Sequence, residues 1–125
     1  MAFSIDHQRR RAEFTAGPGF SGTVLSRAVA AMFDKDPRTA SYDLIFDVRG
    51  SDTGATQADL QIVAEAYHRH KRSRGVKYGC FVTTDPNYPL WTAAMDHMFR
   101  DRQNRVFVTV ENARAFLDRA RAKAA

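Results

Sequence analysis

The sequence predicts an α/β domain with a mixed sheet of about five strands and about four helices. Three features support this class: a hairpin-like start, apolar runs of strand length, and amphipathic stretches of helix length that alternate with those runs. Strands that alternate with helices must pair mostly in parallel, so that helices cover the sheet. The expected order along the chain is ββαβαβαβα.

Size and composition indicate one ordinary globular domain. The chain has 125 residues, of which 44% are apolar and 26% are charged, and this suits a single hydrophobic core. We expect one domain over residues 1–125, with a frayed tail over 119–125, which is rich in alanine and arginine. No segment has the roughly 20 apolar residues that span a bilayer, and the amino terminus lacks an apolar signal segment. A cytoplasmic location is therefore expected.

The first third of the chain is predicted to form a hairpin and a helix. Apolar and polar residues alternate over 3–7 and again over 12–16, which is the period of half-buried strands. Ser21 is expected to cap the first helix, whose apolar residues share one face. Asp36 and Pro37 should end it, because proline has no amide donor and restricts the residue before it.

The middle of the chain contains the predicted central strand. Residues 42–48 are an almost continuous apolar run, as expected for a strand that is covered on both faces. Thr56, followed by Asp59 three residues later, resembles a capping box. We therefore expect a second helix from Thr56 to near Gly75.

Two further strands and two further helices are predicted after the second helix. An apolar run indicates a strand over 77–84, and a proline-rich turn then leads to a third helix over 90–100. The last strand is predicted over 106–110. Apolar positions at helical spacing over 112–120 suit a closing helix.

Three sequence features accompany this order of elements. The strand over 42–48 continues into Arg49 and Gly50 and so ends in Asp-x-Arg-Gly, the sequence Ala58-Asp59-Leu60 follows it, and the closing stretch covers 105–117. Together with the order of elements, these features resemble the STAS-like domains related to anti-sigma-factor antagonists, in particular their small stand-alone bacterial branch. The resemblance covers nearly the whole chain. It implies a STAS-like fold and a regulatory or protein-interaction role without catalysis, with a protein partner or a homodimer.

The resemblance also implies a phosphorylated residue at the start of the second helix. The better-known antagonists carry an Asp-Ser-Ser-Gly turn there, whereas this chain has Gly-Ser-Asp-Thr-Gly-Ala-Thr over 50–56. Thr56 is the best candidate phosphoacceptor, because a phosphate at a helix amino terminus meets free backbone NH groups and the positive end of the dipole. Thr53 and Ser51 are weaker candidates. Helix capping alone also explains Thr56.

Two surfaces at the carboxyl ends of the strands are candidates for recognition. The loop after the central strand, with Asp47, Arg49 and Asp52, is predicted to contact the protein partner. Tyr88 and Trp91 lie at a strand-to-helix turn, where open α/β folds bind ligands, although Trp91 can equally be a core residue. The alternative function is therefore the binding of a small hydrophobic ligand or lipid beside the third helix.

Other chemistries have little support in the sequence. His68 and His70 are two residues apart and point to different sides of a helix, so no metal site is expected. Cys80 lies in an apolar strand without an adjacent base, and no cofactor motif is present, so no enzyme activity is predicted. The net charge is +5, but the basic residues at the end of the second helix suit its dipole. A nucleic-acid partner is therefore not expected.

Overall fold

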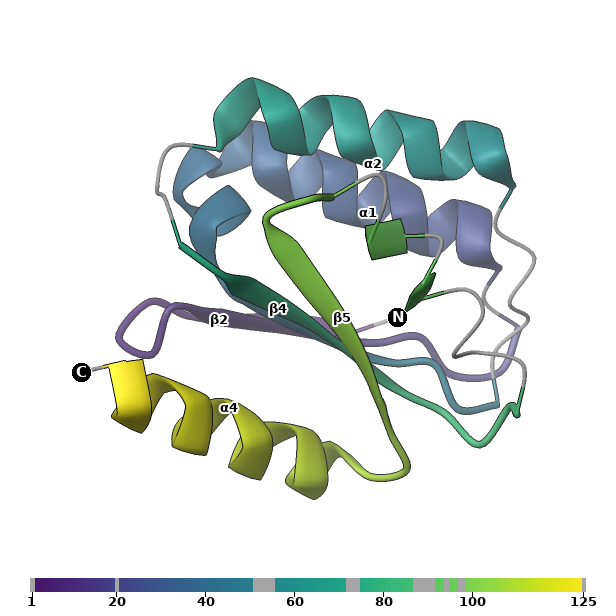
Figure 1. The fold of residues 1–125 in the computed structure, drawn as a ribbon. Helices are drawn as coiled ribbons and strands as arrows, with labels where there is room; N and C mark the ends of the chain where they lie inside the picture. The colour runs from purple at the N-terminus through teal and green to yellow at the C-terminus, as the bar shows by residue number, and fades with distance from the viewer. Residues whose placement is uncertain are drawn as a thin grey trace.

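In the computed structural model of the chain, a five-stranded mixed sheet lies between helices on its two faces (Figure 1). The structure describes residues 2–19, 21–50, 56–71, 75–86, 92–93, 95–96 and 99–124. The predicted α/β class and mixed sheet are confirmed. Three α-helices are defined within these ranges, so the predicted four helices and the STAS-like order stay predictions.

The strands cross the sheet in the order in which they follow along the chain. β1 (Ala2–Asp6) pairs antiparallel with β2 (Arg11–Thr15), and β3 (Asp43–Asp47), β4 (Lys77–Val82) and β5 (Arg102–Phe107) continue the sheet in parallel with β2. β3 is the central strand, as its apolar run predicts, and its first four residues are buried. A strand that is covered on both faces has no side that faces solvent, and this explains why apolar and polar residues do not alternate along β3.

Two helices cover one face of the sheet and the last helix covers the other (Figure 1). α1 (Gly22–Lys35) and α2 (Gln57–His70) lie side by side on one face, and α4 (Val110–Ala124) packs on the opposite face. Right-handed crossovers between parallel strands that are added in one direction place their helices on the same face. α4 connects no strands, so it can cover the other face. None of the helices in the described ranges is long and apolar enough to cross a membrane.

Local sequence signals set the ends of α1 and the start of α2, as predicted. The Ser21 hydroxyl accepts a hydrogen bond from an amide of the first turn of α1 at 3.3 Å. A short 3₁₀ helix, η1 (Pro37–Ser41), follows α1 where the proline stops it. Thr56 and Asp59 form the predicted capping box at the start of α2.

Two predicted boundaries are wrong. α2 ends at His70, with Lys71 as its cap, and not near Gly75. β5 starts and ends earlier than the predicted 106–110, and α4 already begins at Val110. β5 is an edge strand whose side chains are mostly exposed or half-buried, so its polar first half carries no apolar signal.

Two further predictions concern the third helix and the end of the chain. Of the predicted third helix over 90–100, residues 92–93 and 95–96 are helical, 99–100 are not, and the others lie outside the described residues. The fraying expected over 119–125 stays a prediction. α4 itself continues to Ala124.

Four phenylalanines, one from each of the first four strands, stack in a row across the sheet. The strand register aligns Phe3, Phe14, Phe46 and Phe81, and neighbouring ring centroids are 4.8 to 5.5 Å apart. Phe14 is 1% exposed, whereas Phe3 on the edge strand is 56% exposed. The three inner rings belong to the larger core, which lies between the sheet and the α1–α2 pair.

A smaller core lies beneath α4. Ile45, Cys80 and Val82 of the sheet pack there with Ala113 and Leu117 of α4, and all five residues are fully buried. This packing orients α4 along the sheet. Its last turns thereby reach the amino ends of β3 and β4 (Figure 1).

Phe14→Ala should lower the free energy of unfolding by about 3–5 kcal/mol, because it removes a ring that is stacked on both sides within the core. Phe3→Ala should cost less than about 1 kcal/mol, since its ring is half exposed. Urea unfolding of the full chain measures both values. Similar losses for the two variants would contradict the position of Phe3 at the open end of the row.

Candidate functional site

A bidentate ion pair joins Asp47, the last residue of β3, to Arg49 just after the strand. Arg49 Nε donates to Asp47 Oδ1 at 2.9 Å and Nη2 donates to Oδ2 at 2.8 Å, while the Arg49 amide also donates to Oδ1. The hydrogen bonds from Arg49 lower the pKa of Asp47 below its usual value. The Asp47 side chain is 14% exposed and that of Arg49 is 44% exposed. The pair therefore presents a fixed guanidinium at the carboxyl edge of the sheet.

Asp59 connects the starts of α1 and α2 at this same edge. Its Oδ2 accepts hydrogen bonds from the Thr56 amide at 2.9 Å and from the Thr23 hydroxyl at 2.7 Å. The Thr56 hydroxyl accepts a hydrogen bond from the Asp59 amide at 3.1 Å. The bonds from Thr56 and Thr23 lower the pKa of the Asp59 carboxyl. The two helix starts are therefore tied together by one carboxylate.

The capping box has a consequence for Thr56 as a phosphoacceptor. Thr56 is exposed, so its hydroxyl can be reached from solvent. A phosphate on that hydroxyl would lie next to the Asp59 carboxylate, and two negative groups at this distance repel each other. Phosphorylation would therefore open the cap as well as add charge.

The structure describes three of the predicted site residues, and all three lie at the carboxyl edge. Asp47 and Arg49 are in direct contact, and Thr56 begins α2. The other five predicted residues lie outside the described ranges, namely Ser51, Asp52, Thr53, Tyr88 and Trp91.

The opposite, amino edge of the sheet has a row of buried charges that the sequence patterns do not predict. The first residue of each parallel strand is charged and at most 6% exposed; these residues are Arg11, Asp43, Lys77 and Arg102. Charged side chains are almost never buried to this degree without partners. Each of the four has a polar partner from another element.

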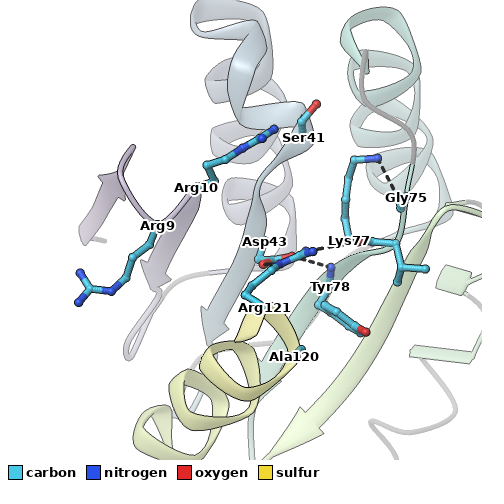
Figure 2. A pocket seen from close by; sticks show the side chains of 10 residues that line it. Arg9, Arg10, Ser41, Asp43, Gly75, Lys77, Tyr78, Ala120 and Arg121 are labelled. Carbon is cyan, nitrogen blue, oxygen red and sulfur yellow. Dashed lines mark hydrogen bonds and ion pairs between the residues drawn. The ribbon is translucent and has the colours of Figure 1, made fainter. Parts of the chain in front are cut away.

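Asp43, at the start of the central strand, is bound by Arg121 of α4 (Figure 2). Arg121 Nε donates to Asp43 Oδ2 at 2.7 Å, Nη2 donates to Oδ1, and the Tyr78 amide donates to the same Oδ1 at 3.0 Å. The hydrogen bonds to Asp43 raise the pKa of Arg121. Arg121 also lies 5.5 Å from the centroid of the Tyr78 ring. The end of α4 is thus attached to the middle of the sheet.

A second network on the other face joins α2 to β4 and β5. The Tyr67 hydroxyl donates to Asp101 Oδ2 at 2.7 Å, and Lys77 Nζ donates to the same oxygen at 3.3 Å. Burial acts to raise the pKa of Asp101, but the hydrogen bonds from Tyr67 and Lys77 outweigh it, and the pKa is lowered. Arg102 lies 4.9 Å from the Tyr67 ring centroid and donates to two backbone carbonyls at the end of η1.

A cavity of about 380 Å³ opens at the amino edge, between the β1–β2 turn, β3, β4 and the end of α4 (Figure 2). Its charged lining consists of Arg9, Arg10, Asp43, Lys77 and Arg121. The rest of its lining is formed by Ser41, Gly75, Val76, Tyr78 and Ala120. The cavity is therefore predominantly basic, with a partly apolar wall.

Most of the positively charged side chains in the described lining of this cavity are paired with carboxylates. Three of its four cations have a carboxylate partner: Arg9 has Asp6, Lys77 has Asp101, and Arg121 has Asp43. The guanidinium of Arg10 forms no hydrogen bond or ion pair within the described residues and lies 5.8 Å from the Tyr42 ring centroid, while the Arg10 carbonyl accepts a hydrogen bond from the Asp43 amide. Among the described residues that line the cavity, Arg10 is therefore the cation without a carboxylate partner.

One sequence signal could have located the amino edge. A charged residue directly precedes or begins each apolar strand, as Asp43 and Lys77 do, and the amino ends of parallel strands meet at one edge. The contribution of Arg121 has no such signal. Its place beneath β3 depends on how α4 packs, and helical periodicity gives only the face of a helix and not its partner.

The remaining nucleophile and metal candidates are part of the framework. Cys80 is fully buried beneath α4, and burial raises the pKa of its thiol to about 12. It is therefore a neutral thiol near pH 7. His70 Nε2 lies 2.7 Å from Asp34 Oδ1. In the described part of the chain, no three His, Cys, Asp or Glu side chains are arranged to hold a metal ion.

Comparisons with known proteins give no relative for this chain. No protein-family model, no curated protein and no solved structure matches it significantly. The resemblance to STAS-like domains therefore stays a prediction.

Thr56→Ala should lower the free energy of unfolding by about 1 kcal/mol, because the first turn of α2 loses its cap. Thr56→Ser keeps the hydroxyl and should change the free energy of unfolding little. Urea unfolding followed by circular dichroism measures both variants. A loss for Thr56→Ser as large as that for Thr56→Ala would contradict the capping role of the hydroxyl.

The free energy of unfolding should fall as the pH rises from about 9 toward 12. The free thiol of Cys80 ionises near pH 9.0 in the unfolded chain, whereas the folded chain keeps the proton up to about pH 12. Below pH 9 the thiol is protonated in both states, so it does not change the free energy of unfolding. Above pH 9 the unfolded chain releases this proton and is thereby stabilised relative to the folded chain.

Cys80→Ala should reduce this dependence, measured by urea unfolding between about pH 8 and 11. Part of the slope should remain, because burial also raises the pKa of Tyr67. The same slope in Cys80→Ala and the unmodified chain would contradict the buried thiol.

Proposed function

We propose that the chain is a non-enzymatic interaction module of the STAS-like type, which recognises a protein partner through the carboxyl edge of its sheet. The observation that carries this proposal is the bidentate ion pair between Asp47 and Arg49, called the clamp from here on, at the same edge as the capped start of α2. The partner is another protein or a second copy of the chain. The experiment below distinguishes these two.

The clamp supports recognition because it fixes a long side chain before any partner binds. Ordering a free arginine on binding costs conformational entropy, and an arginine that is already held loses less of it. Arginine is also frequent among the residues that contribute most to interface affinity. Arg49 is held by Asp47 and still 44% exposed, so it can donate from the rest of its guanidinium.

The surroundings of the clamp add to its suitability. Val108 follows β5 at the same edge, with β4 between β5 and β3, and it is 58% exposed, so an apolar side chain is also available at this edge. The Asp59 bonds to Thr23 and Thr56 hold the neighbouring helix starts. Rigid frames that present such groups on loops are typical of binding surfaces.

A binding role is also consistent with how the reactive groups are used. The carboxylates of Asp47 and Asp59 hold loops and helix starts, and their lowered pKa values keep them ionised near pH 7. The Cys80 thiol is buried and neutral. These groups support the fold, which favours an interaction module over an enzyme.

The proposal includes a switch at Thr56. A phosphate there would displace Asp59 from the cap and release the Asp59 bond to Thr23, so the starts of both helices would change together. A partner that reads this edge would then bind differently. The switch rests on the resemblance to phosphorylated antagonists and on the exposure of Thr56.

Arg49→Ala should weaken partner binding by about tenfold or more, because it removes a pre-ordered charged contact from the centre of the proposed surface. The measurement is quantitative affinity capture from a lysate of the native cells, with light scattering of the purified chain to detect dimers. Arg38→Ala is the matched control. Arg38 forms a similar bidentate pair with Asp36, after the end of α1 at the other edge.

The proposal requires a partner or a dimer that is lost in Arg49→Ala and kept in Arg38→Ala. A monomer with no captured protein, or equal capture by all three chains, would contradict it. A Thr56→Glu variant tests the switch in the same assay. Unchanged binding by that variant would remove the switch and leave the interaction surface.

A further inference from the structure

The basic cavity at the amino edge has features of a ligand site that are independent of the proposed interaction surface. It lies at the opposite ends of the strands from Arg49. Its volume of about 380 Å³ falls in the range of small-molecule sites. Its lining combines charged side chains with the hydroxyls of Ser41 and Tyr78 and the apolar side chains of Val76 and Ala120.

Two polar side chains in the cavity form no hydrogen bond or ion pair within the described residues. One is the guanidinium of Arg10 and the other is the hydroxyl of Ser41. In Figure 2 the Arg10 side chain extends toward Ser41. A guanidinium and a hydroxyl together can donate hydrogen bonds to the oxygens of one carboxylate.

Arg10 also has a backbone conformation that its residue type does not favour. Its φ is +54°, in the left-handed region where glycine is the usual residue. The arginine occupies this position at the tight turn between β1 and β2. Residues in such conformations cluster at binding sites, where the side chain is needed despite the strain.

The remaining wall of the cavity is suited to an apolar group. Val76 is 44% exposed and lies in the lining together with Ala120 and Tyr78. A ligand body in the cavity would cover this side chain. Burial of apolar surface of this kind contributes favourably to binding.

The pairing of the lining cations favours a ligand with one negative charge. Among the described lining residues, the other three cations have carboxylate partners and Arg10 has none. Asp43 holds Arg121 and would repel a second anion from that end of the cavity. A ligand with one negative charge at the Arg10 end therefore matches the site better than a phosphate, which has a charge of about −1.5 to −2 near pH 7.

We propose that this cavity binds a small organic carboxylic acid. The carboxylate lies at Arg10 and Ser41, and the compact apolar body lies against Val76, Ala120 and Tyr78. Binding at this site does not depend on the interaction surface at the carboxyl edge. Each proposal can therefore fail without the other.

The test is a ¹H–¹⁵N NMR titration of the full chain with benzoate and with hexanoate as an aliphatic counterpart. Benzamide is the neutral probe of the same shape as benzoate, and inorganic phosphate is the competing anion. We expect saturable shifts at the amides of Ser41, Val76 and Tyr78 with at least one of the two carboxylates. Benzamide should bind about tenfold more weakly or worse, because it lacks the charge that Arg10 requires.

Arg10→Gly should weaken carboxylate binding by about tenfold or more while the fold is retained, because glycine suits the backbone at this position. Arg38→Ala removes an exposed arginine outside the cavity and should leave binding unchanged. The rest of the spectrum reports whether each variant is folded. No saturable shift with either carboxylate, equal binding by Arg10→Gly, or tighter binding of phosphate than of either carboxylate would overturn the proposal.

Discussion

The ion pair between Asp43 and Arg121 connects the central strand to the last helix, and much of the structure depends on it. Asp43 is 2% exposed at the start of β3, where a carboxylate without a cation would be costly. Two further ion pairs, Arg11 with Asp118 and Arg114 with Glu13, join α4 to β2, whereas the Asp43–Arg121 pair joins it to the central strand. The bidentate pair gives the position of α4 a directional contact, and it also forms one end of the basic cavity.

The central strand has an ion pair between an aspartate and an arginine at each of its ends. Asp43 binds Arg121 at the amino end, and Asp47 binds Arg49 at the carboxyl end. At one end the arginine comes from a distant helix and closes a cavity, whereas at the other it comes from the adjacent loop and is presented to solvent. The proposed ligand site and the proposed partner surface are therefore separated by the length of one buried strand.

Local signals in the sequence predicted much of the framework, and tertiary features account for what they did not predict. The apolar run over 42–48 identified the central strand, and the pair Thr56 and Asp59 identified the start of α2, because both depend on neighbouring residues only. The bounds of β5 were predicted wrongly because an edge strand tolerates polar residues, so the polar first half of β5 gave no strand pattern. The role of Arg121 could not be predicted, since the tail of α4 looks like a solvated, alanine-rich end until its packing against the sheet is known.

The measurement that tests the central claim most directly is a double-mutant cycle of Asp43→Ala and Arg121→Ala, followed by urea unfolding of all four proteins. If the pair attaches α4 to the sheet, the loss in the double variant should be smaller than the sum of the single losses by about 1–3 kcal/mol. Additive losses, within about 0.5 kcal/mol, would contradict it, because they would mean that the two residues stabilise the chain independently.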